Sequence, residues 1–119
     1  MGERKSNPAF LNGIPEMLIL QLLSRRAMYG YELVQAITAA SREEFEFGEG
    51  CVYPILHRLE SQGLLKSAKE SVSGRVRVVY CATPRGKAQL AQSVGSWQRV
   101  VTAVNHALQG GERGRPGLA

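Results

Sequence analysis

The stretch that most constrains the fold is residues 50–65, Gly-Cys-Val-Tyr-Pro-Ile-Leu-His-Arg-Leu-Glu-Ser-Gln-Gly-Leu-Leu. Its apolar positions have the i, i+3, i+4, i+7 spacing of a short helix with one buried face. These positions are Val52, Ile55, Leu56 and Leu59. Gly63 then suits the left-handed end of the helix. If the helix begins near residues 49–51, Pro54 falls in its first turn, where a missing N–H costs little.

The opposite face of this expected helix carries hydrogen-bonding and aromatic groups and no carboxylate. It consists of Tyr53, Pro54, His57, Arg58 and Ser61. Such a surface suits contact with DNA: Arg58 and Tyr53 fit phosphates, while His57 and Ser61 fit base edges. The alternative is a plain exposed helix face, and the sequence does not decide which residue would read bases.

The positive charge of the chain is concentrated in one segment. The 119 residues carry a net charge of +5, and residues 66–87, with six basic side chains and one acidic, account for all of it. Those basic residues are Lys66, Lys69, Arg75, Arg77, Arg85 and Lys87. A solvated basic face is the alternative, but a patch this concentrated favours phosphate binding. We therefore predict that Lys66, Arg75 and Arg77 contact DNA.

The order of expected elements indicates a fold. Helices are expected at residues 15–26 and from residue 31 to about 40, with residues 28–31 as a turn between them. After the central helix, residues 65–72 and 75–81 read as two strands joined by Ser73-Gly74. Three helices followed by a basic hairpin form a winged helix-turn-helix, in which the third helix enters the major groove. The fold class is therefore mainly α with a small β-hairpin.

A long helix is expected to follow the hairpin, because Thr83 suits an N-cap and Pro84 the first helical position. Its apolar residues form a heptad seam, which is typical of helices that pair. The seam consists of Leu90, Val94, Trp97, Val101, Val104 and Leu108. We predict a homodimer formed through this helix. The expected organisation is an N-terminal arm (1–13), a DNA-binding domain (14–82), a dimerisation helix (83–109) and a disordered tail (110–119).

Other classes of function find little support in the composition. The chain contains no aspartate and two histidines, and it lacks a glycine-rich phosphate loop or a cluster with metal-ligand spacing. We therefore expect neither an enzyme nor a cofactor or metal. Cys51 and Cys81 are expected to be small, half-buried residues. No apolar run is long enough to span a bilayer, and the basic start lacks a signal-peptide core, so a cytoplasmic protein is expected.

Three motifs are distinctive: Met28-Tyr29-Gly30-Tyr31-Glu32-Leu33, the segment from Gly50 to Leu64, and Ser73-Gly74-Arg75 with Tyr80. Together they resemble motifs of the PadR family of bacterial transcriptional regulators. The resemblance covers about residues 14–108 and implies a DNA-binding regulator. With a single C-terminal helix, the chain resembles the short subfamily, whose members dimerise through that helix.

Residues 95–100, around Trp97, resemble the segment with which multidrug-sensing members of that subfamily stack flat aromatic ligands. The resemblance implies a ligand site formed by Phe10, Met17, Trp97, Val101 and Val104. The expected function is a repressor that binds a pseudo-palindromic operator and is released by a planar hydrophobic or cationic ligand. The alternative function is a winged-helix protein-interaction dimer without small-molecule sensing. The alternative role of Trp97 is that of a large filler of the dimer seam.

Overall fold

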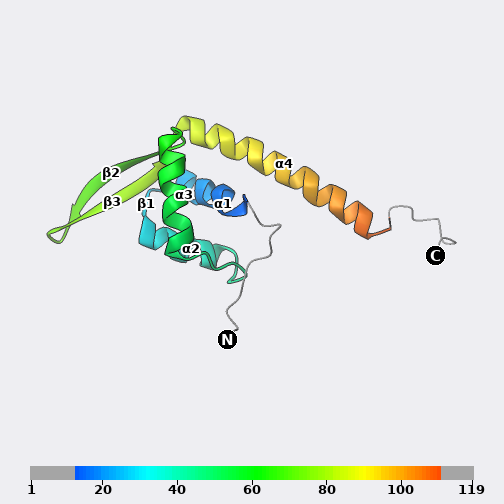
Figure 1. Ribbon diagram of the computed structural model, residues 1–119, viewed down its shortest axis with the longest axis horizontal. Coiled ribbons are helices and arrows are strands. Elements are labelled where there is room, and N and C mark those ends of the chain that lie inside the picture. Colours follow the sequence, from blue (N-terminus) through cyan, green and yellow to red (C-terminus); the bar gives the residue numbers. More distant parts are fainter. Residues whose placement is uncertain (1–12, 111–119) are drawn as a thin grey trace.

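The computed structural model describes residues 13–110, and its elements follow the expected order. Figure 1 shows a body of helices, with a β-hairpin and a long C-terminal helix projecting from it in different directions. The helices are α1 (Ile14–Arg25), α2 (Gly30–Ala40), α3 (Glu49–Ser61) and α4 (Pro84–Leu108), and the strands are β1 (Met28–Tyr29), β2 (Leu65–Val72) and β3 (Arg75–Ala82). The predicted class, mainly α with a small β-hairpin in a winged-helix arrangement, is confirmed.

The sheet contains one strand more than the sequence predicted. Residues 28 and 29, expected as part of a turn, form β1 and pair antiparallel with β3, giving the strand order β1-β3-β2. A strand of two residues is too short to show the alternation by which strands are recognised. The hairpin itself has the predicted turn, with Val72 opposite Arg75 and positive φ values at Ser73 and Gly74. This geometry is that of a type I′ turn, whose twist matches the flanking strands.

The helix α3 buries the predicted face. Its four apolar residues, Val52, Ile55, Leu56 and Leu59, are all buried in the core, where α3 packs against α1, α2 and β2. The helix ends in a Schellman motif: Gly63, with φ 78°, donates to the Glu60 carbonyl, and Leu64 donates to the Leu59 carbonyl. This ending turns the chain directly into β2.

The position predicted for Pro54 is wrong. The helix α3 begins at Glu49, so Pro54 lies in the second turn, inside the helix. There the proline removes the hydrogen bond that would otherwise reach the carbonyl of Gly50. Gly50 and Pro54 are both exposed, so water can donate a hydrogen bond to the unpaired carbonyl near this helix end.

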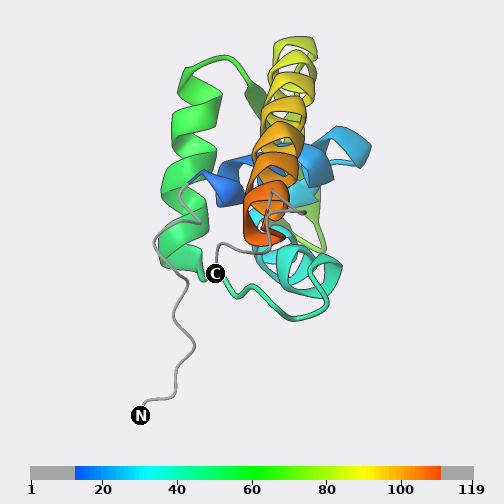
Figure 2. The same cartoon turned by 90° about the vertical axis from the view of Figure 1, so that its right-hand side faces the viewer.

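The helix α4 begins as predicted. Thr83 is its N-cap, with the hydroxyl accepting from the Gly86 amide at 3.0 Å, and Pro84 is its first residue. Its first half packs on α1 and the core, and its second half extends past the body, as Figure 1 shows. In Figure 2, which is turned by 90°, the same helix lies in front of the body and is seen foreshortened. Among residues 13–110, no helix combines the length and apolarity needed to span a lipid bilayer.

Candidate nucleic-acid interface

The outer face of α3 presents the residues that the sequence singled out. Pro54, His57, Arg58 and Ser61 are exposed and Tyr53 is half-buried. The rings of Tyr53 and His57, one helical turn apart, have centroids 6.4 Å apart and are tilted by 52°. His57 presents donor and acceptor nitrogens to solvent, so this part of α3 can make hydrogen bonds to base edges or phosphates.

Arg58 differs from its neighbours because its charge is already paired. Its guanidinium forms an ion pair with Glu16 of α1. Both side chains are partly exposed, so the pair is a weak surface interaction that a phosphate can displace. Ser61 also has an internal partner, since its hydroxyl donates to the Arg58 carbonyl at 2.9 Å. Arg58 and Ser61 therefore have internal partners, and Tyr53 and His57 form the part of this face that is freest to contact another molecule.

We call the β2–β3 hairpin the wing. Its predicted basic residues are distributed along its length, from its base to its tip. Lys66 lies near its base, opposite Cys81, and Arg75 lies at its tip, next to the turn. Arg77 lies between them and places its guanidinium 4.8 Å from the ring centroid of Tyr29, a cation–π contact. All three are exposed. The wing therefore presents positive charge along its length, as contact with a phosphate backbone requires.

A cleft of about 510 Å³ lies where α3, the wing and the start of α2 meet. Tyr53 and His57 line it from α3, Arg77 and Val78 line it from the wing, and Gly30 lines it from α2. The predicted reading residues and a predicted phosphate-binding residue therefore share one concave surface.

The cleft also includes residues that the sequence analysis did not assign to the site. Tyr29 forms a hydrogen bond to Glu70 of the wing, at 2.8 Å, and this bond raises the pKa of the Tyr29 hydroxyl above its usual value. Gly30 lies against the ring of Tyr53. Tyr29 and Gly30 belong to the Met28–Leu33 motif. In the sequence, this motif indicated a family but did not indicate that its residues lie beside α3 and the wing. Burial similarly raises the pKa of Tyr80, on the inner side of the cleft.

The expected dimerisation seam of α4 is only partly covered by the body. Leu90 packs against the core of its own chain, and Val94 and Val101 are half-buried. Trp97, Val104 and Leu108 are exposed, with 41%, 48% and 77% of their surface accessible. Val100, which lies beside the seam and was not predicted, is 53% exposed. The C-terminal half of α4 is therefore an uncovered apolar face.

A shallow groove of about 410 Å³ brings Trp97 close to α1. Met17 of α1 and Val100 of α4 line it together with Trp97. Two of the five residues predicted for a ligand site thus lie together, while Val101 and Val104 lie outside the lining of this groove. Phe10 lies outside the described residues.

Within residues 13–110, no three His, Cys, Asp or Glu side chains are grouped so as to hold a metal ion. Cys51 and Cys81 are free and half-buried, as expected.

Comparison with known proteins places these features in a family. The model of the "Transcriptional regulator PadR-like family" matches residues 19–92, which span α1 to the first turns of α4. The transcriptional regulator Rv3488 of Mycobacterium tuberculosis is 42% identical over 74 residues, covering 62% of this chain and 66% of that protein. An uncharacterized protein of Lysinibacillus sphaericus is 30% identical over 84% of this chain and 93% of its own.

Solved structures show the same fold over most of the chain. A transcriptional regulator from Clostridium thermocellum superposes with a TM-score of 0.76 at 28% identity, covering 82% of this chain and 96% of that one. A PadR family regulator from Eggerthella lenta gives a TM-score of 0.75 at 29% identity, covering 84% and 86%. These coverages include the long C-terminal helix in part.

Proposed function

The chain belongs to the PadR-like family of transcriptional regulators, and from this premise we propose that it is a homodimeric repressor that binds a pseudo-palindromic operator. Members of this family are regulators of transcription and not enzymes. A role on DNA implies a cytoplasmic protein.

The observation that carries the proposal is the shared surface of α3 and the wing. Tyr53 and His57 line the same cleft as Arg77, and Arg75 extends beyond it at the wing tip. In a winged helix, α3 lies in the major groove while the wing follows neighbouring phosphates. On this arrangement, Tyr53 and Pro54 contact the groove wall and His57 reads a base edge. Lys66, Arg75 and Arg77 bind phosphates.

Arg58 and Ser61 have a secondary place in this proposal. Arg58 must exchange Glu16 for a phosphate, and Ser61 must release the Arg58 carbonyl before its hydroxyl can donate to DNA. Each exchange replaces one hydrogen bond with another, so the net gain is smaller than for an unpaired group.

The uncovered face of α4 supports the homodimer. Exposed apolar side chains gathered on one helix face are typical of a protein interface. A two-fold axis through this seam would pair Trp97, Val101, Val104 and Leu108 with their copies, with Val94 beside them. Leu90, which packs on its own core, would contribute to the seam only at its margin.

Selection of bound sequences from a random DNA pool tests the proposed function. A symmetric dimer should enrich two inverted half-sites whose centres lie about 10 base pairs, one helical turn, apart. Enrichment of a single unpaired half-site would contradict the dimer. A pool that stays unenriched although the protein is folded would contradict DNA recognition.

We further propose that a planar hydrophobic or cationic ligand binds between two symmetry-related Trp97 rings and releases the operator. The groove formed by Met17, Trp97 and Val100 supports this, because indole faces attract flat and cationic groups. Such a ligand regulates only if it binds the DNA-bound and free dimers unequally.

Tryptophan fluorescence tests the ligand site, since Trp97 is the one tryptophan of the chain. Ethidium and Hoechst dyes should quench it saturably, and Trp97→Ala should abolish dye binding. Absence of quenching by a panel of planar compounds would leave Trp97 as a filler of the seam.

A further inference from the structure

The wing is attached to the body by a short backbone ladder. In the described residues, β1 pairs with β3 at two positions, Met28 with Tyr80 and Tyr29 with Val79. Beyond this ladder, β2 and β3 pair only with each other. A two-stranded hairpin is marginally stable on its own. The direction of the outer wing therefore depends on side-chain contacts with the body.

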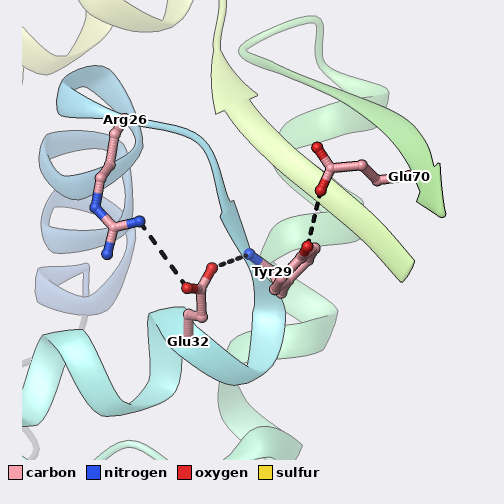
Figure 3. A network of polar contacts seen from close by, with 4 residues as sticks. All are labelled: Arg26, Tyr29, Glu32 and Glu70. Atoms are coloured by element: carbon pink, nitrogen blue, oxygen red, sulfur yellow. Dashed lines mark hydrogen bonds and ion pairs between the residues drawn. The ribbon is translucent and has the colours of Figure 1, made fainter. Parts of the chain in front are cut away.

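Tyr29, at the last rung of that ladder, makes such contacts with both strands of the wing. Its hydroxyl donates to Oε1 of Glu70 at 2.8 Å, and its ring lies 4.8 Å from the guanidinium carbon of Arg77. Glu70 and Arg77 are directly opposite each other on β2 and β3. Tyr29 therefore holds one complete cross-strand pair of the wing, as Figure 3 shows for its bond to Glu70.

Tyr29 is itself fixed to the helical body. Its backbone amide donates to Oε1 of Glu32 in α2 at 3.0 Å, and Glu32 lies 4.0 Å from a guanidinium nitrogen of Arg26 at the end of α1. Figure 3 shows these contacts as one chain from α1 through α2 to the wing. The Tyr29 hydroxyl is protonated at neutral pH, as a phenol with a pKa near 10 is, and its bond to Glu70 raises that pKa further.

We propose that Tyr29 is a positioning residue for the wing, holding the Glu70–Arg77 pair so that Arg75 meets the DNA backbone at a set place. This inference rests on the proposed DNA-binding function. Residues 71–76, outward of the pair, form the tip that carries Arg75. A tip that is ordered before binding avoids the conformational entropy that a mobile hairpin would lose on DNA. The Tyr29 hydroxyl also gives a hydrogen-bond partner to Glu70, the one carboxylate among residues 66–87.

Backbone ¹⁵N relaxation of the free protein tests the positioning role directly. Tyr29→Phe keeps the ring and removes the donor, so residues 71–76 should show lower heteronuclear NOE values than in the wild type. Glu70→Ala should do the same, whereas Glu70→Gln retains an acceptor oxygen and should leave the tip ordered. Tyr31→Phe is the matched control for the NOE values, because that exposed hydroxyl accepts from Gln35 within α2 and leaves the wing contacts intact. Tyr31 lines the same cleft as Tyr53 and His57, so this variant is not a control for DNA affinity.

DNA affinity, measured on Tyr29→Phe and the wild type, tests the consequence. Tyr29→Phe should bind every sequence about three- to tenfold more weakly, with unchanged base preferences, because it loses one hydrogen bond to a charged group and no base contact. Unchanged NOE values in Tyr29→Phe would overturn the inference, and so would a mobile tip with unchanged affinity. If the wild type itself bound no DNA, the proposed function would fail, and the NOE values would still decide whether Tyr29 orders the wing.

Discussion

At the scale of single residues, Gly30 shows how the helical body sets the shape of the surface that we propose to face DNA. Gly30 is the first residue of α2, and its φ does not lie in the left-handed region, so its backbone conformation does not demand glycine. Its environment does, because an added Cβ would come within 2.6 Å of the Tyr53 ring. The missing side chain thus lets Tyr53 rest against α2, next to His57.

Gly30→Ala should therefore displace Tyr53 without unfolding the protein. The added Cβ clashes with the far end of the Tyr53 side chain, which can rotate away. The free energy of unfolding should therefore change by less than about 1 kcal/mol. DNA affinity should fall about three- to tenfold, because Tyr53 loses its place beside the groove wall. Calorimetry and fluorescence anisotropy measure the two effects.

Gly50→Ala provides the matched control for that prediction. Gly50 lies in the first turn of α3 with open space around its Cα, so alanine should leave Tyr53 in place and stabilise the helix by at most about 1 kcal/mol. If both substitutions changed affinity equally, the contact between Gly30 and Tyr53 would have no role in binding.

The sequence predicted residue burial well where a helical period defined it and poorly where distant segments meet. The stripe of Val52, Ile55, Leu56 and Leu59 is buried as expected, because the period alone specifies the face. The ion pair between Arg58 and Glu16 joins two helices that are far apart in the sequence, so no local sequence pattern could predict it. Pro54 was misplaced because α3 begins at Glu49, at the early edge of the expected start, which makes Pro54 its sixth residue and puts it beyond the first turn.

At the scale of elements, the junction between the wing and α4 fixes where the long helix points. The Thr83 hydroxyl donates to the Gly63 carbonyl at 2.7 Å while accepting from the Gly86 amide. Gly86 is buried against the Leu64 carbonyl, and a Cβ there would collide with that backbone oxygen. The start of α4 is thus packed directly on the turn that follows α3.

Gly86→Ala should destabilise the protein, although alanine favours helices. The obstacle is backbone, which cannot rotate away, so we expect a loss of about 2–3 kcal/mol in the free energy of unfolding. Urea denaturation of Gly86→Ala and Gly50→Ala should give changes of opposite sign. A stabilised Gly86→Ala protein would show that α4 can move off Leu64 at no cost.

The elements also differ in how far sequence could predict them. The bounds of α4 could be predicted from its N-terminal Thr83-Pro84 and its heptad period. The turn of the wing could be predicted from Ser73-Gly74, which is a strong local signal. The strand β1 was missed because its two residues become a strand only by pairing with β3. The attachment of the wing to the body could not be foreseen for the same reason.

At the scale of the whole molecule, the exposed second half of α4 is the feature that a single chain leaves unexplained. Trp97, Val100 and Val104 are each about half exposed along one side of a helix that extends past its own body (Figure 1). Complete burial of such side chains contributes about 1.5–3 kcal/mol for each aliphatic residue. A second copy of the chain offers a complementary face with the same spacing.

Val104→Glu should consequently shift the protein toward monomers. A two-fold axis would bring two glutamates into one apolar seam, which should weaken association at least about tenfold. Asn105→Glu adds the same charge one residue away from the seam and should leave the dimer intact. Light scattering after size exclusion at micromolar concentration separates the outcomes, and a wild-type monomer would refute the proposed dimer.

The central claim, that α3 reads bases while the wing binds phosphates, is tested most directly by DNA selection with two variants. His57→Ala should lose preference at the same position in both half-sites and keep the wild-type salt dependence. Arg75→Ala should select the wild-type motif, while the slope of log K against log salt becomes shallower by about 1.8, or 0.9 for each of two lost phosphate contacts. A His57→Ala motif identical to the wild type, or an Arg75→Ala slope that does not change, would contradict this assignment.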